Sequence, residues 1–82
     1  MKKRTACITG ASSGIGREMA KKLSALGYNL ILVSRNTKAL KELAQTLDTD
    51  CEIYACDLSD GKSCIKLGRK LSKRNDIFVF IN

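Results

Sequence analysis

Three glycines lie in the turn between a short apolar segment and an amphipathic one, and this turn constrains the fold more than any other part of the sequence. Residues 9–16 read Thr-Gly-Ala-Ser-Ser-Gly-Ile-Gly. Gly10 allows a sharp turn at a strand end, Gly14 lets the backbone come close to a ligand, and Gly16 lets the following helix pack tightly on a sheet. The start of that helix offers unpaired N–H groups and the positive end of the helix dipole, which favour a pyrophosphate. The turn therefore predicts a dinucleotide-binding strand–helix unit, and because no Gly-Lys-Ser/Thr follows, it is not a P-loop.

Apolar runs and helical spacing alternate along the rest of the chain. Four apolar runs are typical of strands and cover residues 5–9, 30–33, 51–56 and 77–81. Such alternation predicts parallel strands joined by right-handed crossovers. The predicted fold class is therefore α/β, a partial Rossmann-type doubly wound sheet with strand order 3-2-1-4. The first two helices are expected on one face of the sheet and the third helix on the other.

Each predicted helix has an inner face and a start or stop signal. The inner face of the first helix is predicted to consist of Ile15, Met19, Leu23 and Leu26. The inner face of the third helix is predicted to consist of Cys64, Leu67, Gly68 and Leu71. Gly27 is expected to end the first helix in the left-handed conformation. Asn36 or Thr37 can cap the second helix, and Ser59 or Asp60 the third.

The turn and two later motifs resemble the short-chain dehydrogenase/reductase family, whose members are NAD(P)-dependent oxidoreductases with one Rossmann-type domain. Residues 9–16 resemble the coenzyme signature of the family, Asp57-Leu58 resembles its adenine-contacting position, and Phe80-Ile81-Asn82 resembles the start of its Asn-Asn-Ala-Gly motif. The resemblance covers the whole chain. The cofactor-binding residues expected from the turn, the strand ends and the resemblance are Gly10, Ser12, Ser13, Gly14, Ile15, Gly16, Ser34, Arg35, Asp57, Leu58 and Asn82.

Ser34 and Arg35 follow the second predicted strand and indicate which dinucleotide binds. A Rossmann domain that prefers NAD usually has a carboxylate there, which accepts from the ribose hydroxyls and would repel a 2′-phosphate. A serine can donate to that phosphate, and a guanidinium can form two parallel hydrogen bonds with it. We therefore expect NADP(H) to be preferred, with NAD(H) as the alternative cofactor. In the family a second basic residue stands just before the middle glycine, where this chain has Ser13, and the competing interpretation of Arg35 is a solvated loop charge.

The catalytic groups that the resemblance implies are missing from these 82 residues. Family chemistry needs a Ser, an Asn and a Tyr-x-x-x-Lys motif, whereas Tyr28 and Tyr54 are followed four residues later by Leu32 and Leu58. The chain has no histidine, which excludes Ser-His-Asp and Cys-His nucleophile systems within it. We expect no catalytic residue here, and hydride transfer between NADPH and a carbonyl or alcohol only in a longer protein. Residues 1–82 are interpreted as the N-terminal half of an NAD(P)-binding domain, truncated at the end of its fourth strand.

The fourth strand, residues 77–81, would then be an unpaired apolar edge. Such an edge predicts marginal stability and self-association. Replacing Val79 with lysine is the substitution that the sequence suggests for raising solubility.

Composition limits the other classes of partner. The net charge is +7, but Lys62, Lys66, Arg69 and Lys73 recur at helical spacing without interleaved aromatic residues, which favours a solvated helix face over a nucleic-acid or membrane patch. No apolar run is long enough for a membrane span or a signal-peptide core, so we expect a cytoplasmic protein. Without C-x-x-C pairs or histidine, the four cysteines indicate reduced thiols rather than a metal site or disulfides.

Two other functions stay open at this point. One is a non-catalytic module from a shortened gene, which binds a dinucleotide or a partner protein through its open edge. The other is a basic nucleic-acid binder, whose affinity would weaken steeply with salt. The module shares the dinucleotide site and differs from the reductase only in whether more chain follows.

Overall fold

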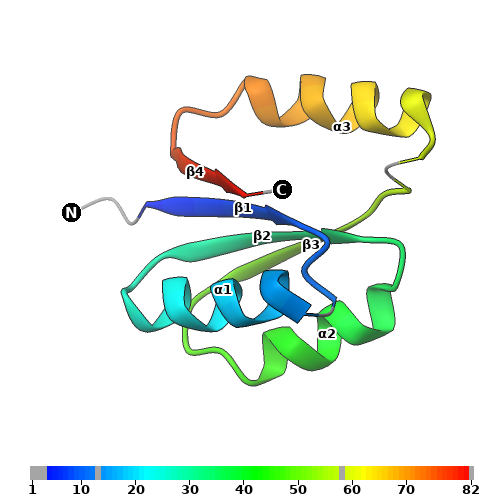
Figure 1. Ribbon diagram of the computed structural model, residues 1–82. Coiled ribbons are helices and arrows are strands. Elements are labelled where there is room, and N and C mark those ends of the chain that lie inside the picture. The colour runs from blue at the N-terminus through cyan, green and yellow to red at the C-terminus, as the bar shows by residue number, and fades with distance from the viewer. Residues whose placement is uncertain (1–3, 13, 58, 82) are drawn as a thin grey trace.

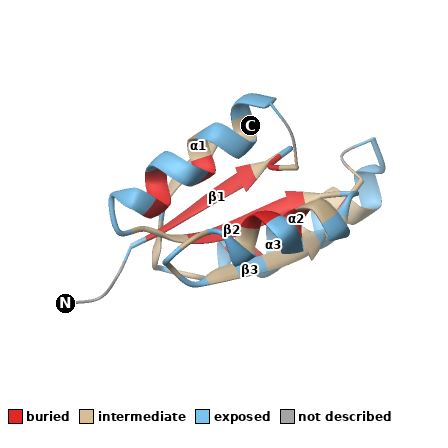
Figure 2. Ribbon diagram, turned by 90° about the horizontal axis from the view of Figure 1, so that it is seen from below, coloured by how far each residue is buried: buried red, intermediate tan, exposed pale blue. Residues whose placement is uncertain are grey.

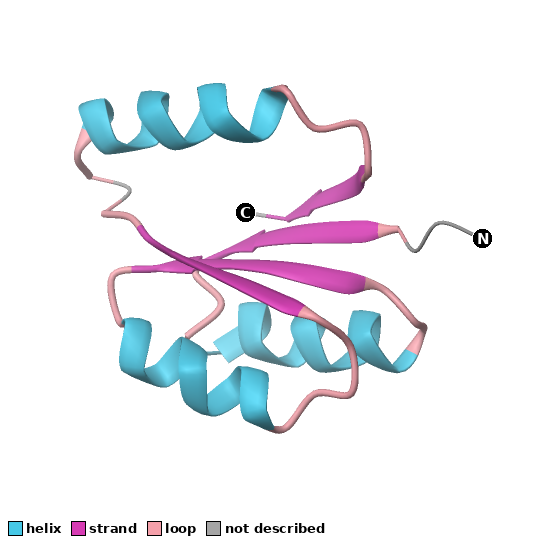
Figure 3. Ribbon diagram, turned by 180° about the vertical axis from the view of Figure 1, so that it is seen from behind, coloured by secondary structure: helices cyan, strands magenta, loops and turns pink. Residues whose placement is uncertain are grey.

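Strands and helices alternate in the computed structural model, which describes residues 4–12, 14–57 and 59–81. The elements are β1 (Thr5–Thr9), α1 (Gly14–Ala25), β2 (Asn29–Ser34), α2 (Thr37–Gln45), β3 (Cys51–Ala55), α3 (Gly61–Ser72) and β4 (Ile77–Ile81). All strand pairs are parallel and their order is β3-β2-β1-β4. Helices α1 and α2 cover one face of the sheet and α3 covers the other (Figures 1 and 3). The predicted α/β class, strand order and distribution of the helices are confirmed.

The two central strands carry most of the core (Figure 2). Alternate residues of β2 face opposite sides: Leu30 and Leu32 pack in the cluster under α1 and α2, whereas Ile31 and Val33 pack in the cluster under α3. A strand buried on both faces needs apolar residues at every position. The apolar run at residues 30–33 is explained by this double burial.

The inner face of α1 differs from the predicted stripe. Ile15 is 82% exposed and Leu26 is 75% exposed. Leu23 is buried as predicted, and the other buried residues of the helix are Ala20 and Ser24. Ala20 and Ser24 are small and let the helix lie close to the sheet, whereas Ile15 is at the start of α1 and Leu26 follows its last residue.

The helix boundaries follow the expected signals, with one residue of α3 misplaced. Gly27 has φ of +95°, the left-handed conformation predicted for it. The Asn36 side chain caps α2 by accepting from Ala39, and the Asp60 side chain caps α3. Leu71 is buried and Gly68 is exposed. The inner face of α3 follows Cys64, Leu67 and Leu71, and Gly68 lies outside this row.

A β-bulge marks the start of β4. Thr5 of β1 pairs with Ile77, but the next residue of β1 pairs with Val79, so Phe78 is an extra residue in the ladder. Such an insertion reverses the alternation of side chains. Ile77 therefore packs on the α3 side, while Val79 packs with the α1 and α2 side, and Phe78 is 62% exposed. Lysine at Val79 would enter the core, so the substitution that the sequence suggested is the wrong one for this edge.

Arg74 connects the amino-terminal ends of β3, β1 and β4. Its Nη1 donates to both carboxylate oxygens of Glu52 at 2.8 and 2.6 Å, and its Nε and Nη2 donate to Asp76 at 3.0 and 2.7 Å. Thr5 Oγ1 also donates to Asp76 at 2.8 Å. The hydrogen bonds from Arg74 and Thr5 lower the pKa of Asp76, and the hydrogen bonds to Asp76 and Glu52 raise the pKa of Arg74. We call these four residues the Arg74 network.

The outer face of α3 is basic, as the sequence indicated. Lys62, Lys66, Arg69 and Lys73 are all exposed, and Ile65 lies among them and is exposed as well. In the described part of the chain, no helix has the length and apolar character needed to cross a membrane.

Candidate functional site

The carboxyl ends of three neighbouring strands form the candidate site. Because β1, β2 and β3 are parallel and adjacent, the segments that follow them meet at one edge of the sheet. A hollow of about 370 Å³ opens there, and its lining consists of Gly10, Ser34, Arg35, Cys56, Asp57 and Ser59. Each of the three strand ends contributes to this lining.

The glycine turn is fixed to the end of β2. The N–H groups of Gly10 and Ala11 donate to the carbonyl of Val33 at 2.9 and 3.4 Å. Gly10 has φ of +65° and Gly14 has φ of +59°, a conformation that side chains other than glycine rarely adopt. The two glycines are therefore needed for the path of the turn.

Gly16 is needed for a different reason, because there is no space for a side chain at this position. A Cβ atom at this position would lie 2.5 Å from the carbonyl oxygen of Gly10 and 3.2 Å from Cα of Ala11. The first turn of α1 thus packs directly on the glycine turn. The sequence predicted a close contact at Gly16 with the sheet, whereas these closest atoms belong to the turn that precedes the helix.

Hydroxyl groups connect the glycine turn with the end of β2. Ser34 Oγ donates to Ser12 Oγ at 2.8 Å and accepts from the N–H of Asn36 at 3.1 Å. Arg35 follows Ser34 and is exposed. Its guanidinium forms no hydrogen bond or ion pair within the described part of the chain, so it is available to an anion.

Asp57 is held at the end of β3 by Ser59. Its Oδ1 accepts from the Ser59 hydroxyl at 2.6 Å and from the Ser59 N–H at 2.9 Å. These two hydrogen bonds lower the pKa of Asp57, and the positive charge of Arg35 contributes in the same direction. Asp57 is therefore ionised at neutral pH, with one oxygen already engaged by Ser59.

The structure brings four of the eleven predicted site residues together around one hollow. Gly10, Ser34, Arg35 and Asp57 line one hollow. Ser12 accepts a hydrogen bond from Ser34, which lines the hollow. The others that can be placed, Gly14, Ile15 and Gly16, begin α1. Ser13, Leu58 and Asn82 lie outside the described residues.

Two lining residues escaped the sequence analysis as site residues. Cys56 was interpreted as a strand end and Ser59 as a helix cap. A signal for Ser59 was present, because an aspartate followed two residues later by a hydrogen-bonding residue is typical of a turn in which the carboxylate accepts from the backbone. For Cys56 we find no such signal in the sequence.

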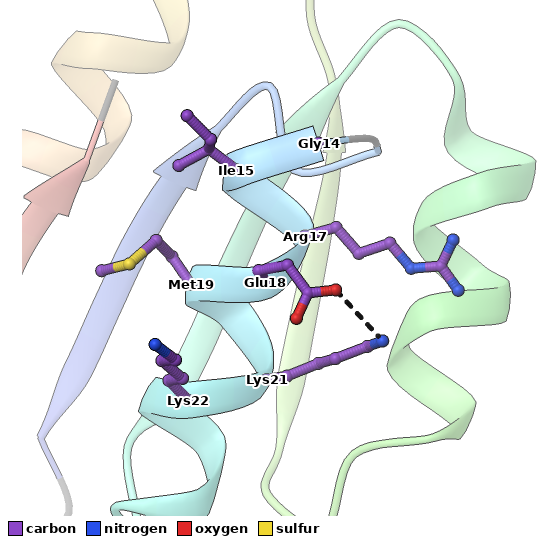
Figure 4. Close-up of a pocket in the computed structure, with 7 residues that line it drawn as sticks. All are labelled: Gly14, Ile15, Arg17, Glu18, Met19, Lys21 and Lys22. Atoms are coloured by element: carbon purple, nitrogen blue, oxygen red, sulfur yellow. Dashed lines mark ion pairs between the residues drawn. The ribbon is translucent and has the colours of Figure 1, made fainter.

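A larger hollow, of about 720 Å³, lies on the outer surface of α1. Figure 4 shows Ile15, Met19 and Lys22 on one side of the helix, and Arg17 and Lys21 on the side of α2. Lys21 forms an exposed ion pair with Glu18 at 3.6 Å. This hollow is made by one helix surface and contains none of the residues at the ends of β2 and β3, so it does not combine the groups expected to bind a dinucleotide.

Comparison with known proteins gives one consistent family. The family model described as short chain dehydrogenase matches residues 4–82. The very-long-chain 3-oxoacyl-CoA reductase of Kluyveromyces lactis is 43% identical in an alignment that covers 94% of this chain and 24% of the reductase. The human inactive hydroxysteroid dehydrogenase-like protein 1 is 34% identical over 96% of this chain and 25% of its own length. The chain thus spans about a quarter of the length of these relatives.

Solved structures with the same fold include proteins that contain NADPH. A short-chain dehydrogenase from Sphingobium yanoikuyae in complex with NADPH superposes with a TM-score of 0.88 at 30% identity. The match covers 94% of this chain and 32% of that protein. The Rossmann-type architecture of the described residues is therefore the one found in these dehydrogenases.

Proposed function

Because this chain belongs to the short-chain dehydrogenase family, we propose that its glycine turn and the adjoining hollow bind the adenosine half of NADP(H). The observation that carries the proposal is the meeting of Gly10, Ser34, Arg35 and Asp57 around one hollow at the carboxyl edge of the sheet. In doubly wound sheets, ligands bind outside the carboxyl ends of the strands. The arrangement here supplies a close backbone approach, an unpaired cation and a carboxylate within one site.

The pyrophosphate is proposed to lie at the start of α1. The first N–H groups of a helix have no partner within the helix, and the helix dipole adds positive potential at this end. Gly14 leaves open space where another residue would carry a Cβ. A phosphate can therefore come close to the backbone there, as the glycine pattern predicts. Ser13 and Ile15 are proposed to contribute to this part of the site.

Arg35 is proposed to select NADP(H) over NAD(H). The two cofactors differ only in the 2′-phosphate, so the discrimination must come from groups around that position. Arg35 has no competing ion pair in the described part of the chain, and a guanidinium binds a phosphate through two parallel hydrogen bonds. Ser34 in this structure donates to Ser12, so its hydroxyl would have to rotate to donate to the phosphate. Arg35 therefore carries most of the proposed preference.

The activity is proposed for a longer protein that contains these residues. In it, NADPH would exchange a hydride with a carbonyl or alcohol substrate, as the family membership indicates. The 82 residues have no Tyr-x-x-x-Lys motif, and we expect them to bind the cofactor without turnover. A second candidate is a non-catalytic dinucleotide-binding module, which is favoured by the match to a relative that is itself described as inactive. Both candidates use the same site, and a Tyr-x-x-x-Lys motif in the longer protein would distinguish the reductase from the module.

We predict that the protein binds NADPH more tightly than NADH by about 10-fold. Hydrogen bonds to a charged group contribute about 1.5–3 kcal/mol, or about 10- to 100-fold in affinity, and the exposure of Arg35 favours the lower end. Isothermal titration of both cofactors into the chain measures the ratio without requiring turnover. Ser34→Asp combined with Arg35→Ala should abolish the preference, because the new carboxylate accepts from the ribose hydroxyls and repels the phosphate.

Arg69→Ala is the matched control. It also removes one exposed arginine, but on the outer face of α3, away from the hollow. It should leave the ratio unchanged. Equal binding of both cofactors by the parent chain, or an unchanged ratio in the double variant, would contradict the role of Arg35.

A further inference from the structure

Two cysteines share the cluster between α3 and the sheet, one just after the end of β3 and the other at the start of α3. Cys56 is the residue after β3 and is 5% exposed, and Cys64 is in the first turn of α3 and half-buried. Cys64 Sγ donates to the carbonyl of Asp57 at 3.9 Å, and both cysteines pack in the cluster between α3 and the sheet. Burial and a hydrogen bond with Cys64 raise the pKa of the Cys56 thiol. Both thiols therefore lie in the same cluster, and Cys64 Sγ contacts the backbone of the residue that follows Cys56.

Backbone hydrogen bonds fix the two ends of this pair. The N–H of Cys56 donates to the carbonyl of Ser34 at 3.2 Å, which ties Cys56 to β2. The N–H of Cys64 donates to the carbonyl of Asp60 at 3.2 Å, and that of Asp60 to Asp57 at 2.9 Å. The positions of both cysteines are therefore fixed by backbone hydrogen bonds, which hold Cys56 beside β2 and Cys64 at the start of α3.

The other two cysteines are placed differently. Cys51 packs on the opposite face of the sheet, in the cluster under α1 and α2. Cys7 shares the α3 side with Cys56, but β2 lies between their strands. Two strand spacings are about 9.6 Å, which exceeds the separation of about 7 Å that a disulfide can bridge. Cys51 and Cys7 therefore serve as reference cysteines in the same chain, because neither is placed to form a disulfide with Cys56.

We propose that Cys56 and Cys64 form a reversible disulfide that ties Cys56 and the adjoining Asp57 to α3 and thereby weakens nucleotide binding in the hollow. All four cysteines are described in this structure, and no disulfide joins them. The effect on the nucleotide rests on the proposed function, whereas formation of the disulfide does not.

A small disulfide such as glutathione disulfide is the oxidant. The half-buried Cys64 thiolate attacks one sulfur of the oxidant, forms a mixed disulfide and releases one glutathione thiolate. The Cys56 sulfur then attacks the Cys64 sulfur, and the second glutathione leaves. The protons of the two cysteines end on the two glutathione thiols, and the two cysteines lose the two electrons that the oxidant gains. Burial of Cys56 favours Cys64 as the sulfur that reacts first.

Closure of this bond changes the lining of the hollow. Two thiols in non-bonded contact must approach to about 2.05 Å to form a disulfide, which draws Cys56 toward α3. Cys56 lines the hollow beside Asp57 and Arg35. Asp57 follows in the chain and moves with it, away from the position in which Ser59 holds it. The loss of one hydrogen bond to the nucleotide corresponds to about two- to tenfold in affinity.

The first experiment measures disulfide formation in the 82-residue chain, without any substitution, in glutathione redox buffers. Samples are quenched with acid and digested with trypsin and a glutamate-specific protease. Cleavage after Glu52, Lys62 and Lys66 places Cys56 in residues 53–62 and Cys64 in residues 63–66, separate from Cys51. We expect these two peptides to be the dominant linked pair, with an effective concentration at least about tenfold higher in buffer than in 8 M urea. An effective concentration that is equal or lower in buffer, or linkage mainly through Cys7, Cys51 or a second chain, would overturn the proposal.

The second experiment titrates NADPH into the reduced and the oxidised chain and into Cys64→Ser under both conditions. We expect oxidation to weaken binding by the chain about two- to tenfold and to leave binding by Cys64→Ser unchanged. Equal affinity of the two forms, despite a confirmed disulfide, would overturn the effect on the hollow. If the reduced chain does not bind NADPH, the proposed function fails, and the peptide mapping alone decides whether the disulfide pair exists.

Discussion

The absence of a side chain at Gly16 allows the first turn of α1 to pack against the backbone of the glycine turn. We predict that Gly16→Ala lowers the free energy of unfolding by about 1–3 kcal/mol, because the added Cβ would meet the backbone carbonyl of Gly10 at 2.5 Å. Backbone atoms of a tight turn cannot move aside as a flexible side chain could. Urea denaturation followed by circular dichroism measures the change.

Gly68→Ala is the control for Gly16→Ala. This glycine lies in α3 with open space around the position of a Cβ. Alanine there should raise the free energy of unfolding by about 0.5–1 kcal/mol, the usual difference between the two residues in a helix. If Gly16→Ala is as stable as the parent chain, the contact with Gly10 is not a constraint.

Asp76 makes the stability of the chain depend on pH. Its pKa is lowered in the folded state, first by hydrogen bonds from Arg74 and then by one from Thr5, and it titrates near 3.9 when unfolded. A carboxyl whose folded pKa is depressed contributes stability above the unfolded value, and this contribution is lost as the pH falls toward the folded value. We predict that the free energy of unfolding decreases from about pH 5 downward and that Asp76→Asn flattens this dependence.

The comparison requires unfolding curves at several pH values between about 2.5 and 7. Asp48→Asn is the control, because Asp48 is exposed and outside the Arg74 network. Asp57 also has a lowered pKa and should leave a residual pH dependence in Asp76→Asn. An unchanged pH dependence in Asp76→Asn would mean that the Arg74 network contributes no stability.

At the scale of elements, hydropathy patterns predicted the order and type of every strand and helix, but for α1 they predicted only one of its three buried residues, Leu23. The periodicity of Ile15, Met19 and Leu26 shows that these residues share one side of a helix. It does not show which side meets the sheet. The orientation depends on Ala20 and Ser24, whose small size permits close packing. A pattern of apolar residues does not show that small side chains allow a helix to pack closer to the sheet.

The start of β4 and the Arg74 network could not be predicted for a related reason. The five apolar residues of β4 have no alternation that would reveal the extra residue, Phe78. The contacts of Arg74 join the turn before β4 with Glu52 of β3, and this proximity depends on the crossover through α3. Such contacts require the register of the strands, which the sequence predicts only coarsely.

The candidate site was more accessible to prediction than the core. Its residues directly follow strands, and parallel strands bring their carboxyl ends to one edge whatever the details of packing. The sequence alone therefore places Gly10, Ser34, Arg35 and Asp57 at one edge of the sheet, where they line one hollow. The hydrogen bonds of Ser34 with Ser12 and of Asp57 with Ser59 depend on side-chain rotation and emerged only from the structure.

For the molecule as a whole, we predict self-association through β4. This strand pairs with β1 on one side, and no strand in the described part of the chain covers its other side. An uncovered edge offers unpaired N–H and C=O groups to a second chain. Phe78→Lys should reduce the association, because Phe78 is exposed and a charge there repels a second copy without entering the core.

Sedimentation velocity at several protein concentrations measures the association. Ile65→Lys is the control, since it places the same charge at an exposed apolar position on α3. It should leave the association of the parent chain unchanged. A parent chain that is monomeric at all concentrations, with a concentration-independent melting temperature, would contradict the prediction.

The central place of β1 has a consequence for the order in which the molecule assembles. Thr5 pairs with Asn29 and also with Ile77, about three times as far along the chain. A threefold longer loop costs about 1 kcal/mol more to close, so β3, β2 and β1 are expected to assemble first. The glycine turn, Ser34 and Asp57 would then reach their native arrangement before β4 arrives. In native-state hydrogen exchange, we expect the amides of β4 to exchange faster than those of β2, and NADPH to slow exchange at the ends of β1 to β3 more than in β4. Exchange of β4 at the same rate as β2 would show that the four strands open as one unit.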